Sequence, residues 1–260
     1  MVPQQPVAGR LRFGLGLIGI GKPWGFADPV VPDESRAREL LERAWTLGVR
    51  YFDTAPSYGV SEERLGRFLA SLSSADRGQV EIATKFGEHW DAGRGEPFVD
   101  HSYDALARSL EGSVSRLGHI DYLQLHKTSP AVLRSQALER AWEFAHSLGI
   151  ARIGASVSDL ESATIAADNP AFSIIQAPYN VEQQTFGDLL EKASASGMLV
   201  ALNRPFGMGK LLYERPGITK RDAFAFVAAR AFDGVVLSGT KSPGHLEENL
   251  GAFREATAQQ

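Results

Sequence analysis

The chain has 260 residues, of which 43% are hydrophobic and 22% are charged, and its formal net charge is −4. That length fits one large domain or two small ones, and the weak acidic balance without a basic run indicates no nucleic-acid partner. No apolar run reaches membrane-spanning length, and the absence of cysteine excludes disulfides and thiol chemistry and fits a cytoplasmic location.

Short apolar segments with high β-propensity alternate with amphipathic stretches from one end of the chain to the other. Ala37, Leu40 and Ala44 show the helical spacing that recurs between these segments. Four glycines stand just past such helices, where a left-handed cap is expected, at Gly48, Gly118, Gly149 and Gly197. We predict eight strands, over Phe13–Gly19, Val49–Asp53, Val80–Lys85, Ile120–His126, Arg152–Ser156, Phe172–Gln176, Leu199–Asn203 and Gly234–Gly239.

This alternation predicts a parallel sheet, and about eight βα units in roughly 250 residues predict a TIM (β/α)8 barrel. A doubly wound sheet is the alternative, because Gly14, Gly16 and Gly19 have the G-x-G-x-x-G spacing of dinucleotide-binding folds. Those glycines lie inside a predicted strand, however, and the next helix begins well downstream, near Glu34. Since no linker or repeat is visible, we expect one barrel domain over residues 1–260.

Polar residues end several of the predicted strands, at the edge where a TIM barrel forms its active site. Asp53, Lys85 and His126 close the second, third and fourth strands, and Tyr58 follows Asp53 by five residues. Singly, such residues are more often helix caps, surface groups or structural hydrogen-bond partners. Their recurrence at the same end of successive strands favours a shared catalytic site.

Several segments together resemble the signature motifs of the aldo-keto reductase family, in particular its bacterial members with a short C-terminus. The matching segments are Phe52-Asp-Thr-Ala55 with Tyr58-Gly59 and Glu63-x-Leu65-Gly66, Thr84-Lys85, Leu125-His126, Arg152-Ile-Gly-Ala-Ser156, Gln176-Ala-Pro-Tyr-Asn180, Pro205-Phe-Gly-Met-Gly-Lys-Leu211 and Ser238–Asn249. The resemblance extends from about Gly14 to Asn249. It implies a nicotinamide cofactor across the barrel mouth and a catalytic tetrad of Asp53, Tyr58, Lys85 and His126.

Physical chemistry supports the roles that this resemblance implies. A carbonyl that accepts a hydride needs a proton donor, and a free tyrosine, with a pKa of about 10, is too weak an acid at neutral pH. The Lys85 ammonium would lower that pKa, and Asp53 would keep Lys85 charged and oriented. His126 would hydrogen-bond the reacting oxygen. We therefore predict that Tyr58 is the general acid in reduction and the general base in oxidation.

The resemblance also implies how the cofactor is held. Ser156 and Gln176 would bind the nicotinamide carboxamide, and Ser242-Pro243 independently predicts a helix start that can bind phosphate. An ordinary capped helix would explain Ser242-Pro243 alone, but not the Gly-Thr-Lys just before it. The other expected cofactor contacts are Arg204, Gly207, Gly239, Thr240, Lys241, His245, Glu248 and Asn249.

Three positions depart from the family pattern. Val157 replaces an Asn that often follows the strand-five Ser, and Asn203-Arg204 replaces an aromatic residue that commonly stacks on nicotinamide. His245 stands where many NADP-preferring members have Arg, and a neutral His is a weaker phosphate partner. Because Lys241 can compensate, we predict NADP as the cofactor, with NAD as the alternative.

The substrate end of the site is less well defined by the sequence. Trp24, His89 and Trp90 fall in loops at the expected barrel mouth, where they would wall the pocket or pack the loops together. The chain has 6 histidines and no cysteine, without H-E-x-x-H spacing, so we expect no metal. The short C-terminal end favours an open pocket for small carbonyls.

We thus predict an NAD(P)-dependent oxidoreductase that interconverts a small aldehyde or ketone and its alcohol. One alternative is a cofactor-binding regulatory subunit of the same fold with little turnover. Another is a TIM-barrel lyase or isomerase that uses Lys85 and Tyr58. The expected partner is a small-molecule substrate rather than nucleic acid or a membrane, and the oligomeric state stays open.

Overall fold

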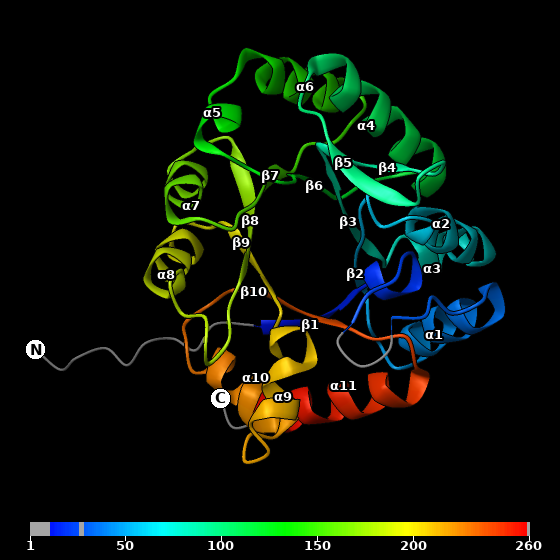
Figure 1. Ribbon diagram of the computed structural model, residues 1–260, viewed down its shortest axis with the longest axis vertical. Coiled ribbons are helices and arrows are strands. Elements are labelled where there is room, and N and C mark those ends of the chain that lie inside the picture. Colours follow the sequence, from blue (N-terminus) through cyan, green and yellow to red (C-terminus); the bar gives the residue numbers. More distant parts are fainter. Residues whose placement is uncertain (1–10, 26–28, 259–260) are drawn as a thin grey trace, which may run out of the picture.

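The computed structural model describes residues 11–25 and 29–258. Eight parallel strands close into a barrel in which the last strand pairs with the first (Figure 1). In spatial order they are β1 (Leu11–Gly16), β2 (Tyr51–Asp53), β3 (Glu81–Phe86), β6 (Tyr122–Leu125), β7 (Ile153–Ser156), β8 (Phe172–Pro178), β9 (Leu199–Asn203) and β10 (Gly234–Gly239). The predicted TIM barrel is confirmed.

Helices surround the barrel on the outside (Figure 1). The longer ones are α1 (Glu34–Thr46), α2 (Ser61–Ser71), α4 (Tyr103–Leu117), α6 (Gln136–Ser147), α7 (Leu160–Ala167), α8 (Gly187–Ala195), α10 (Lys220–Ala228) and α11 (Pro243–Thr257). Shorter helical turns are η1 (Ile18–Ile20), α3 (Ser74–Arg77), α5 (Pro130–Leu133), η2 (Gly207–Gly209) and α9 (Lys210–Glu214). No helix within the described ranges is long and apolar enough to cross a membrane.

The glycine-rich first strand does not open a dinucleotide-binding helix. Gly14 and Gly16 lie in β1, Gly19 lies in the short η1 turn, and the first long helix begins at Glu34. A Cβ atom on Gly14 would lie 2.5 Å from Val235 Cγ1, so glycine is needed there for packing inside the barrel. These positions exclude the doubly wound alternative.

Helix ends follow the chemistry of their flanking residues. The four glycines predicted to end helices have φ values of +89°, +81°, +84° and +92°, at Gly48, Gly118, Gly149 and Gly197. At the start of α11, the Ser242 side chain accepts a hydrogen bond from the His245 backbone N–H, and Pro243 is the first helical residue. The predicted caps are therefore confirmed, and they fix where each chain segment enters the next strand.

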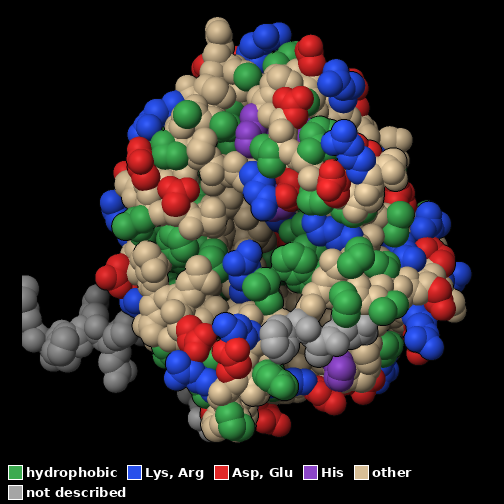
Figure 2. All heavy atoms as spheres, viewed as in Figure 1, with side chains coloured by type: hydrophobic (Ala, Val, Ile, Leu, Met, Phe, Trp, Pro, Cys, Tyr) green, Lys and Arg blue, Asp and Glu red, His purple; other side chains and the backbone are tan. Residues whose placement is uncertain are grey.

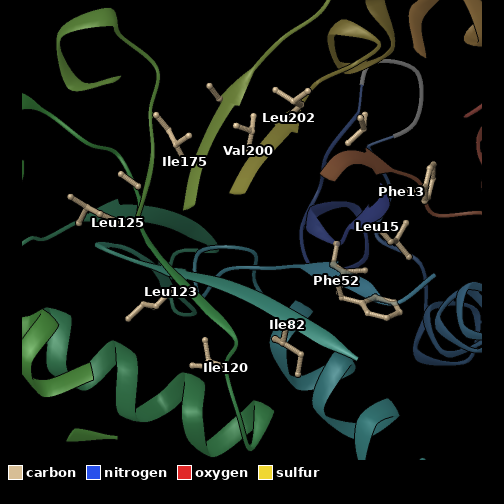
Figure 3. Packing of buried hydrophobic residues seen from close by; sticks show 14 of the residues in the cluster. Phe13, Leu15, Phe52, Ile82, Ile120, Leu123, Leu125, Ile175, Val200 and Leu202 are labelled. Carbon is tan, nitrogen blue, oxygen red and sulfur yellow. The ribbon is translucent and has the colours of Figure 1, made fainter. Parts of the chain in front are cut away.

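Side chains alternate between two apolar layers along each strand. Phe52, Ile82 and Leu123 belong to the outer layer between strands and helices (Figure 3), whereas Tyr51 and Ala83 fill the barrel interior. Because successive strand residues point to opposite faces, the residues two positions beyond Tyr51 and Ala83 also face inward. Those residues are Asp53 and Lys85, so the pleat itself brings the two charges together at the barrel mouth.

An antiparallel hairpin that we did not predict follows β3. It consists of β4 (Glu88–Asp91) and β5 (Glu96–Val99), and its turn contains Gly95 at φ +69°. In Figure 1 it stands beside β3 in front of the barrel. The sequence interpretation of His89 and Trp90 as loop residues is thus wrong, and Glu88 begins this hairpin.

Candidate active site

A buried ion pair lies at the carboxyl ends of β2 and β3. Lys85 Nζ donates to Asp53 Oδ1 over 2.6 Å and to the Thr54 carbonyl over 3.0 Å. Gln176 Nε2, from β8, donates to the other carboxylate oxygen over 3.0 Å. Both charged side chains are almost fully buried, and such a pair is tolerated only when its remaining hydrogen-bonding groups are satisfied. The site is therefore built as one network across three strands.

This network keeps Lys85 charged. Burial lowers the pKa of Lys85, but the Asp53 carboxylate and the Tyr58 oxygen outweigh that effect, so the pKa lies above its ordinary value. The predicted role of Asp53 as the group that holds Lys85 charged agrees with this direction. The ammonium is a fixed positive charge that faces the barrel mouth.

A close backbone approach positions Tyr58 above this ion pair. Val60 N–H donates to the Gly21 carbonyl, and a Cβ atom on Gly21 would lie 1.8 Å from the Tyr58 carbonyl oxygen. Gly59 has a φ of +59°, and a Cβ atom on this residue would lie 2.2 Å from the same Gly21 carbonyl oxygen. Lys85 Nζ lies 5.0 Å from the centroid of the Tyr58 ring. Glycine at positions 21 and 59 thus allows the loops after β1 and β2 to pack in contact and hold the tyrosine.

The acidity of Tyr58 differs from the sequence-based expectation. Burial raises the pKa of Tyr58, and Lys85 opposes that effect only in part, so the net pKa lies above that of a free tyrosine. Lys85 does act in the predicted direction, but desolvation and the Asp53 carboxylate outweigh it. Tyr58 is therefore a protonated donor at neutral pH, as carbonyl reduction requires.

His126 completes the group of four at the end of β6. Its ring is 6.0 Å from the Tyr58 ring, centroid to centroid, in an edge-on arrangement. Its Nδ1 atom lies 3.1 Å from Glu88 Oε2. Burial, followed by the charges of Lys85 and Lys127, holds the pKa of His126 well below its ordinary value. The imidazole is therefore neutral in the folded protein.

The four predicted catalytic residues meet at one end of a cavity of about 770 Å³. Figure 2 shows this face hollowed near its centre, with Lys and Arg side chains around the hollow. The volume is within the usual range of small-molecule sites. Asp53, Tyr58 and His126 line the wall, as do Ser156 and Gln176. The cavity continues to the N-terminus of α11.

The cofactor contacts expected from the sequence divide into two groups. Those that line the cavity are Ser156, Gln176, Arg204, Gly239, Thr240, Lys241 and His245. Gly207, Glu248 and Asn249 do not. Glu248 forms an ion pair with Lys220 on the outer surface, and Asn249 Nδ2 donates to Ser238 Oγ in the interior between α11 and β10.

The three residues expected to wall the substrate pocket also differ in whether they line the cavity. Trp24 lines the cavity, whereas His89 and Trp90 do not. His89 packs its ring against Phe98 and has its Nε2 atom 2.8 Å from the Asp100 carbonyl oxygen. These contacts stabilise the β4–β5 hairpin, so His89 packs within the hairpin and does not line the cavity.

The cavity wall also contains charged and polar residues to which the sequence interpretation gave no role in the site, among them Lys22, Arg36, Glu88, Lys127 and Asn203. Lys127 directly follows His126 at φ +54°, and Glu88 comes three residues after Lys85, so their position beside catalytic residues was the available signal. Asn203 Oδ1 is buried without a hydrogen-bond partner among the described residues. An orphaned acceptor in a cavity wall indicates that a ligand donates to it.

Comparison with known proteins agrees with this geometry. Residues 12–222 match the model of the aldo/keto reductase family. The aldo-keto reductase str7 of Strobilurus tenacellus is 26% identical over 93% of this chain and 83% of its own, and the L-galactose dehydrogenase of Arabidopsis thaliana is 28% identical over 78% and 64%.

Among solved structures, a Pseudomonas aeruginosa protein assigned to the aldo-keto reductases superposes with a TM-score of 0.78 at 26% identity, over 94% of this chain and 89% of that one. The first three curated relatives are matched over 46%, 83% and 64% of their own lengths, which is less than two thirds in two of them. The family match, the barrel and the cavity at its mouth lead to one conclusion: the chain belongs to the aldo/keto reductase family.

Proposed function

We propose that the protein is an NADP-dependent oxidoreductase that interconverts a small aldehyde or ketone and the corresponding alcohol. The observation that carries the proposal is the Tyr58 ring placed 5.0 Å from Lys85 Nζ, above a buried Lys85–Asp53 pair, at one end of a cavity that reaches the N-terminus of α11. A proton donor, a fixed cation and a phosphate-binding helix end are what carbonyl reduction with a dinucleotide requires.

The residues of the cavity fit a nicotinamide cofactor. Ser156, Gln176 and the unpartnered Asn203 Oδ1 offer hydrogen bonds to the carboxamide end. At the other end, the backbone N–H groups of α11 and the side chains of Lys241 and Arg36 suit phosphates. When bound, the reduced cofactor supplies the hydride. The side chain of Val157 cannot hydrogen-bond the carboxamide, and Asn203 is a polar side chain available instead.

The chain's own residues supply the proton. In reduction, Tyr58 donates its hydroxyl proton to the carbonyl oxygen as the carbon accepts the hydride, which gives the alcohol and a tyrosinate. Lys85, held charged by Asp53, stabilises that tyrosinate. In oxidation the tyrosinate takes the alcohol proton back. The ion pair thus acts through Tyr58 without touching the substrate.

An assay of the purified protein tests the proposal: the absorbance of the reduced cofactor is followed during turnover. Small aldehydes and ketones, and the matching alcohols, should change that absorbance with NADPH or NADP⁺. Cofactor binding without turnover on the whole series would support the regulatory-subunit alternative instead. Conversion of a substrate without any added cofactor would support a lyase or isomerase.

A further inference from the structure

The mechanism above gives no role to Lys22, which lines the cavity in the loop after η1. Its Nζ atom lies 5.5 Å from the centroid of the Tyr58 ring and 5.8 Å from the centroid of the Trp90 ring. Lys85 Nζ lies 5.0 Å from the same Tyr58 ring. The ring of the proposed proton donor therefore has two ammonium groups beside it, and Lys22 is the one in the cavity wall.

Lys22 has aromatic neighbours but no anionic partner. Within the described ranges, its Nζ atom takes part in no hydrogen bond or ion pair, and it meets two aromatic rings instead. Glu88 attracts Lys22, but the Glu88 carboxylate forms its ion pair with Lys127, at 3.3 Å. Burial lowers the pKa of Lys22, and Glu88 offsets that effect only in part. A half-buried charge in this state lacks the pairing that such groups normally have in folded proteins.

The described charges at this end of the cavity leave one positive charge in excess. Asp53 balances Lys85, Glu88 balances Lys127, and the imidazole at the end of β6 is neutral. Lys22 remains without a counterpart. The other cationic side chains of the wall are those expected to contact the cofactor: Arg36, Arg204 and Lys241. A substrate that brings a single negative charge to the Tyr58 end would therefore complement it.

Control of the acidity of Tyr58 does not account for Lys22. After burial, the charges that act most on the pKa of Tyr58 are those of Lys85, Asp53 and Glu88. Lys22 is not among these main causes, although its Nζ atom lies near the same ring. Its charge is therefore available to a ligand in the cavity.

We propose that Lys22 is a specificity-determining residue that binds a carboxylate of the substrate, so that the enzyme acts on short oxo acids, which are aldehydes or ketones with a carboxylate a few bonds from the carbonyl. This rests on the proposed reductase function, because the reacting carbonyl oxygen has to meet the Tyr58 hydroxyl. Lys22 and that hydroxyl border the same ring, so a short chain reaches both. One surplus ammonium matches the single charge of a carboxylate, whereas a phosphate carries more charge and three acceptor oxygens.

Binding of an unreactive carboxylate tests Lys22 without any turnover. Butyrate and butyramide have the same shape, but only butyrate is charged. Tryptophan fluorescence of the full-length protein follows both titrations, with and without NADP⁺ and at constant ionic strength, because Trp24 lines the cavity and Trp90 lies beside Lys22. We expect butyrate to bind more tightly than butyramide. Lys22→Met should weaken butyrate by about tenfold or more, as expected for the loss of a hydrogen bond between charged groups.

Two variants serve as controls for this titration. Lys22→Arg keeps the charge and should keep butyrate binding. Lys192→Met makes the matching substitution on α8, where Lys192 pairs with Asp168 away from the cavity wall, and should bind butyrate like the parent.

Three results overturn the role of Lys22. The first is a parent protein that does not distinguish butyrate from butyramide. The second is equal butyrate affinity in Lys22→Met and Lys192→Met. The third is a Lys22→Met protein that loses affinity for NADPH but not for butyrate, which would assign this lysine to the cofactor.

Kinetics with a matched pair of aldehydes test the substrate class. Succinic semialdehyde and isocaproaldehyde have the same branched shape, with a carboxylate in the first where the second has an isopropyl group. We expect kcat/KM in the parent protein to favour succinic semialdehyde. The ratio of the two kcat/KM values should fall by about tenfold or more in Lys22→Met and stay unchanged in Lys192→Met.

The outcomes separate the substrate class from the proposed function. A parent protein that prefers isocaproaldehyde overturns the carboxylate class. So does a higher kcat/KM for glycolaldehyde phosphate than for succinic semialdehyde, which would point to a phosphate at the same site. Absence of turnover on every carbonyl tested contradicts the proposed function, and the butyrate titration then still decides the role of Lys22.

Discussion

At the scale of single residues, the Tyr58 hydroxyl oxygen is where burial and the Lys85 ammonium act in opposite directions. If this oxygen supplies the proton, Tyr58→Phe removes it and leaves the ring in place. We expect reduction to fall by roughly 10²–10⁴-fold, the usual loss with a general acid, while cofactor binding survives. Steady-state rates and cofactor fluorescence titration measure the two effects.

Tyr103 offers a matched control for that substitution. Tyr103 begins α4, outside the cavity lining, and its ring packs against the Arg140 guanidinium of α6, a contact that needs no hydroxyl. Tyr103→Phe should therefore keep the parent rate. A Tyr58→Phe protein that folds, binds cofactor and turns over like the Tyr103→Phe control would remove Tyr58 from the mechanism.

Lys85 links catalysis to stability. Lys85→Met leaves the Asp53 carboxylate buried with Gln176 as its remaining side-chain donor, so we expect a loss of about 3–5 kcal/mol in unfolding free energy. The rate should also fall about as far as in Tyr58→Phe, because the two residues act as one unit. Denaturant titration measures the stability loss. Adding Asp53→Asn should restore part of it, and no recovery would argue against an uncompensated charge as the cause.

The neutral His126 makes stability depend on pH. Its folded-state pKa lies well below the unfolded value of about 6.5. Above that pH both states leave the ring neutral, so this residue contributes no pH dependence there. Below it, the unfolded chain binds a proton that the folded protein rejects, and stability falls as the pH decreases. Melting temperatures from about pH 7 to about pH 5 should therefore drop less steeply in His126→Asn than in the parent; parallel curves would contradict this.

Sequence interpretation identified some of these residues and missed others for a physical reason. Asp53, Lys85 and His126 lie at or next to the carboxyl ends of β2, β3 and β6, and a closed barrel brings strand ends together regardless of the conformations of its loops. Glu88 reaches His126 only because Gly87, at φ +100°, turns the chain back over the barrel mouth into the hairpin. That contact depends on one loop conformation, which residue type and spacing do not determine.

At the scale of elements, we expect the start of α11 to set the preference between NADPH and NADH. Lys241 lies at the phosphate end of the cavity, and its Nζ atom also donates to the Val30 carbonyl over 2.8 Å. We expect NADPH to bind at least as tightly as NADH, and Lys241→Ala to weaken NADPH more, since only NADPH carries the extra phosphate. Loss of the Lys241 contact with the Val30 carbonyl, by contrast, would weaken the binding of NADPH and NADH equally.

Fluorescence titration with both cofactors measures this difference. Lys210→Ala is a suitable control, because Lys210 pairs with Glu214 outside the cavity wall. Equal weakening of NADPH and NADH in Lys241→Ala would show that this lysine orders the loop rather than reading the phosphate. A preference of the parent protein for NADH would instead point to His245.

The β4–β5 hairpin shows why some elements escape sequence interpretation. Its strands have four residues each, and β5 is wholly exposed, so no buried face imposes an alternating pattern. The barrel strands could be predicted because each is a short apolar run and most of them lie between amphipathic helices. Their ends were less certain: the first strand stops at Gly16, because Ile18–Ile20 turns into a helical segment that carries the chain toward Tyr58.

At the scale of the whole molecule, the barrel depends on backbones that approach one another closely. A Cβ atom on Gly154 in β7 would lie 1.8 Å from the Ile174 carbonyl oxygen of β8. Gly154→Ala should therefore force the two strands apart and destabilise the protein by about 1–3 kcal/mol. Gly251 in α11 has open space around its Cα, so Gly251→Ala should stabilise by about 0.5–1 kcal/mol. Denaturant titration should show a lower unfolding free energy for Gly154→Ala and a higher one for Gly251→Ala. The same change in unfolding free energy for both variants would contradict the packing argument.

The pairing of β1 with β10 has a consequence for how the protein is made. The two strands that close the ring are the first and the last in the barrel, and the wall of the cavity takes residues from near both. On the ribosome, seven strands emerge before their ring can shut, with one edge of β1 waiting for a partner. Nascent chains that stop before Gly239 therefore lack both the closing strand and the start of α11, so the open edge of β1 needs protection until β10 has emerged, and the cavity is complete only after that point of synthesis.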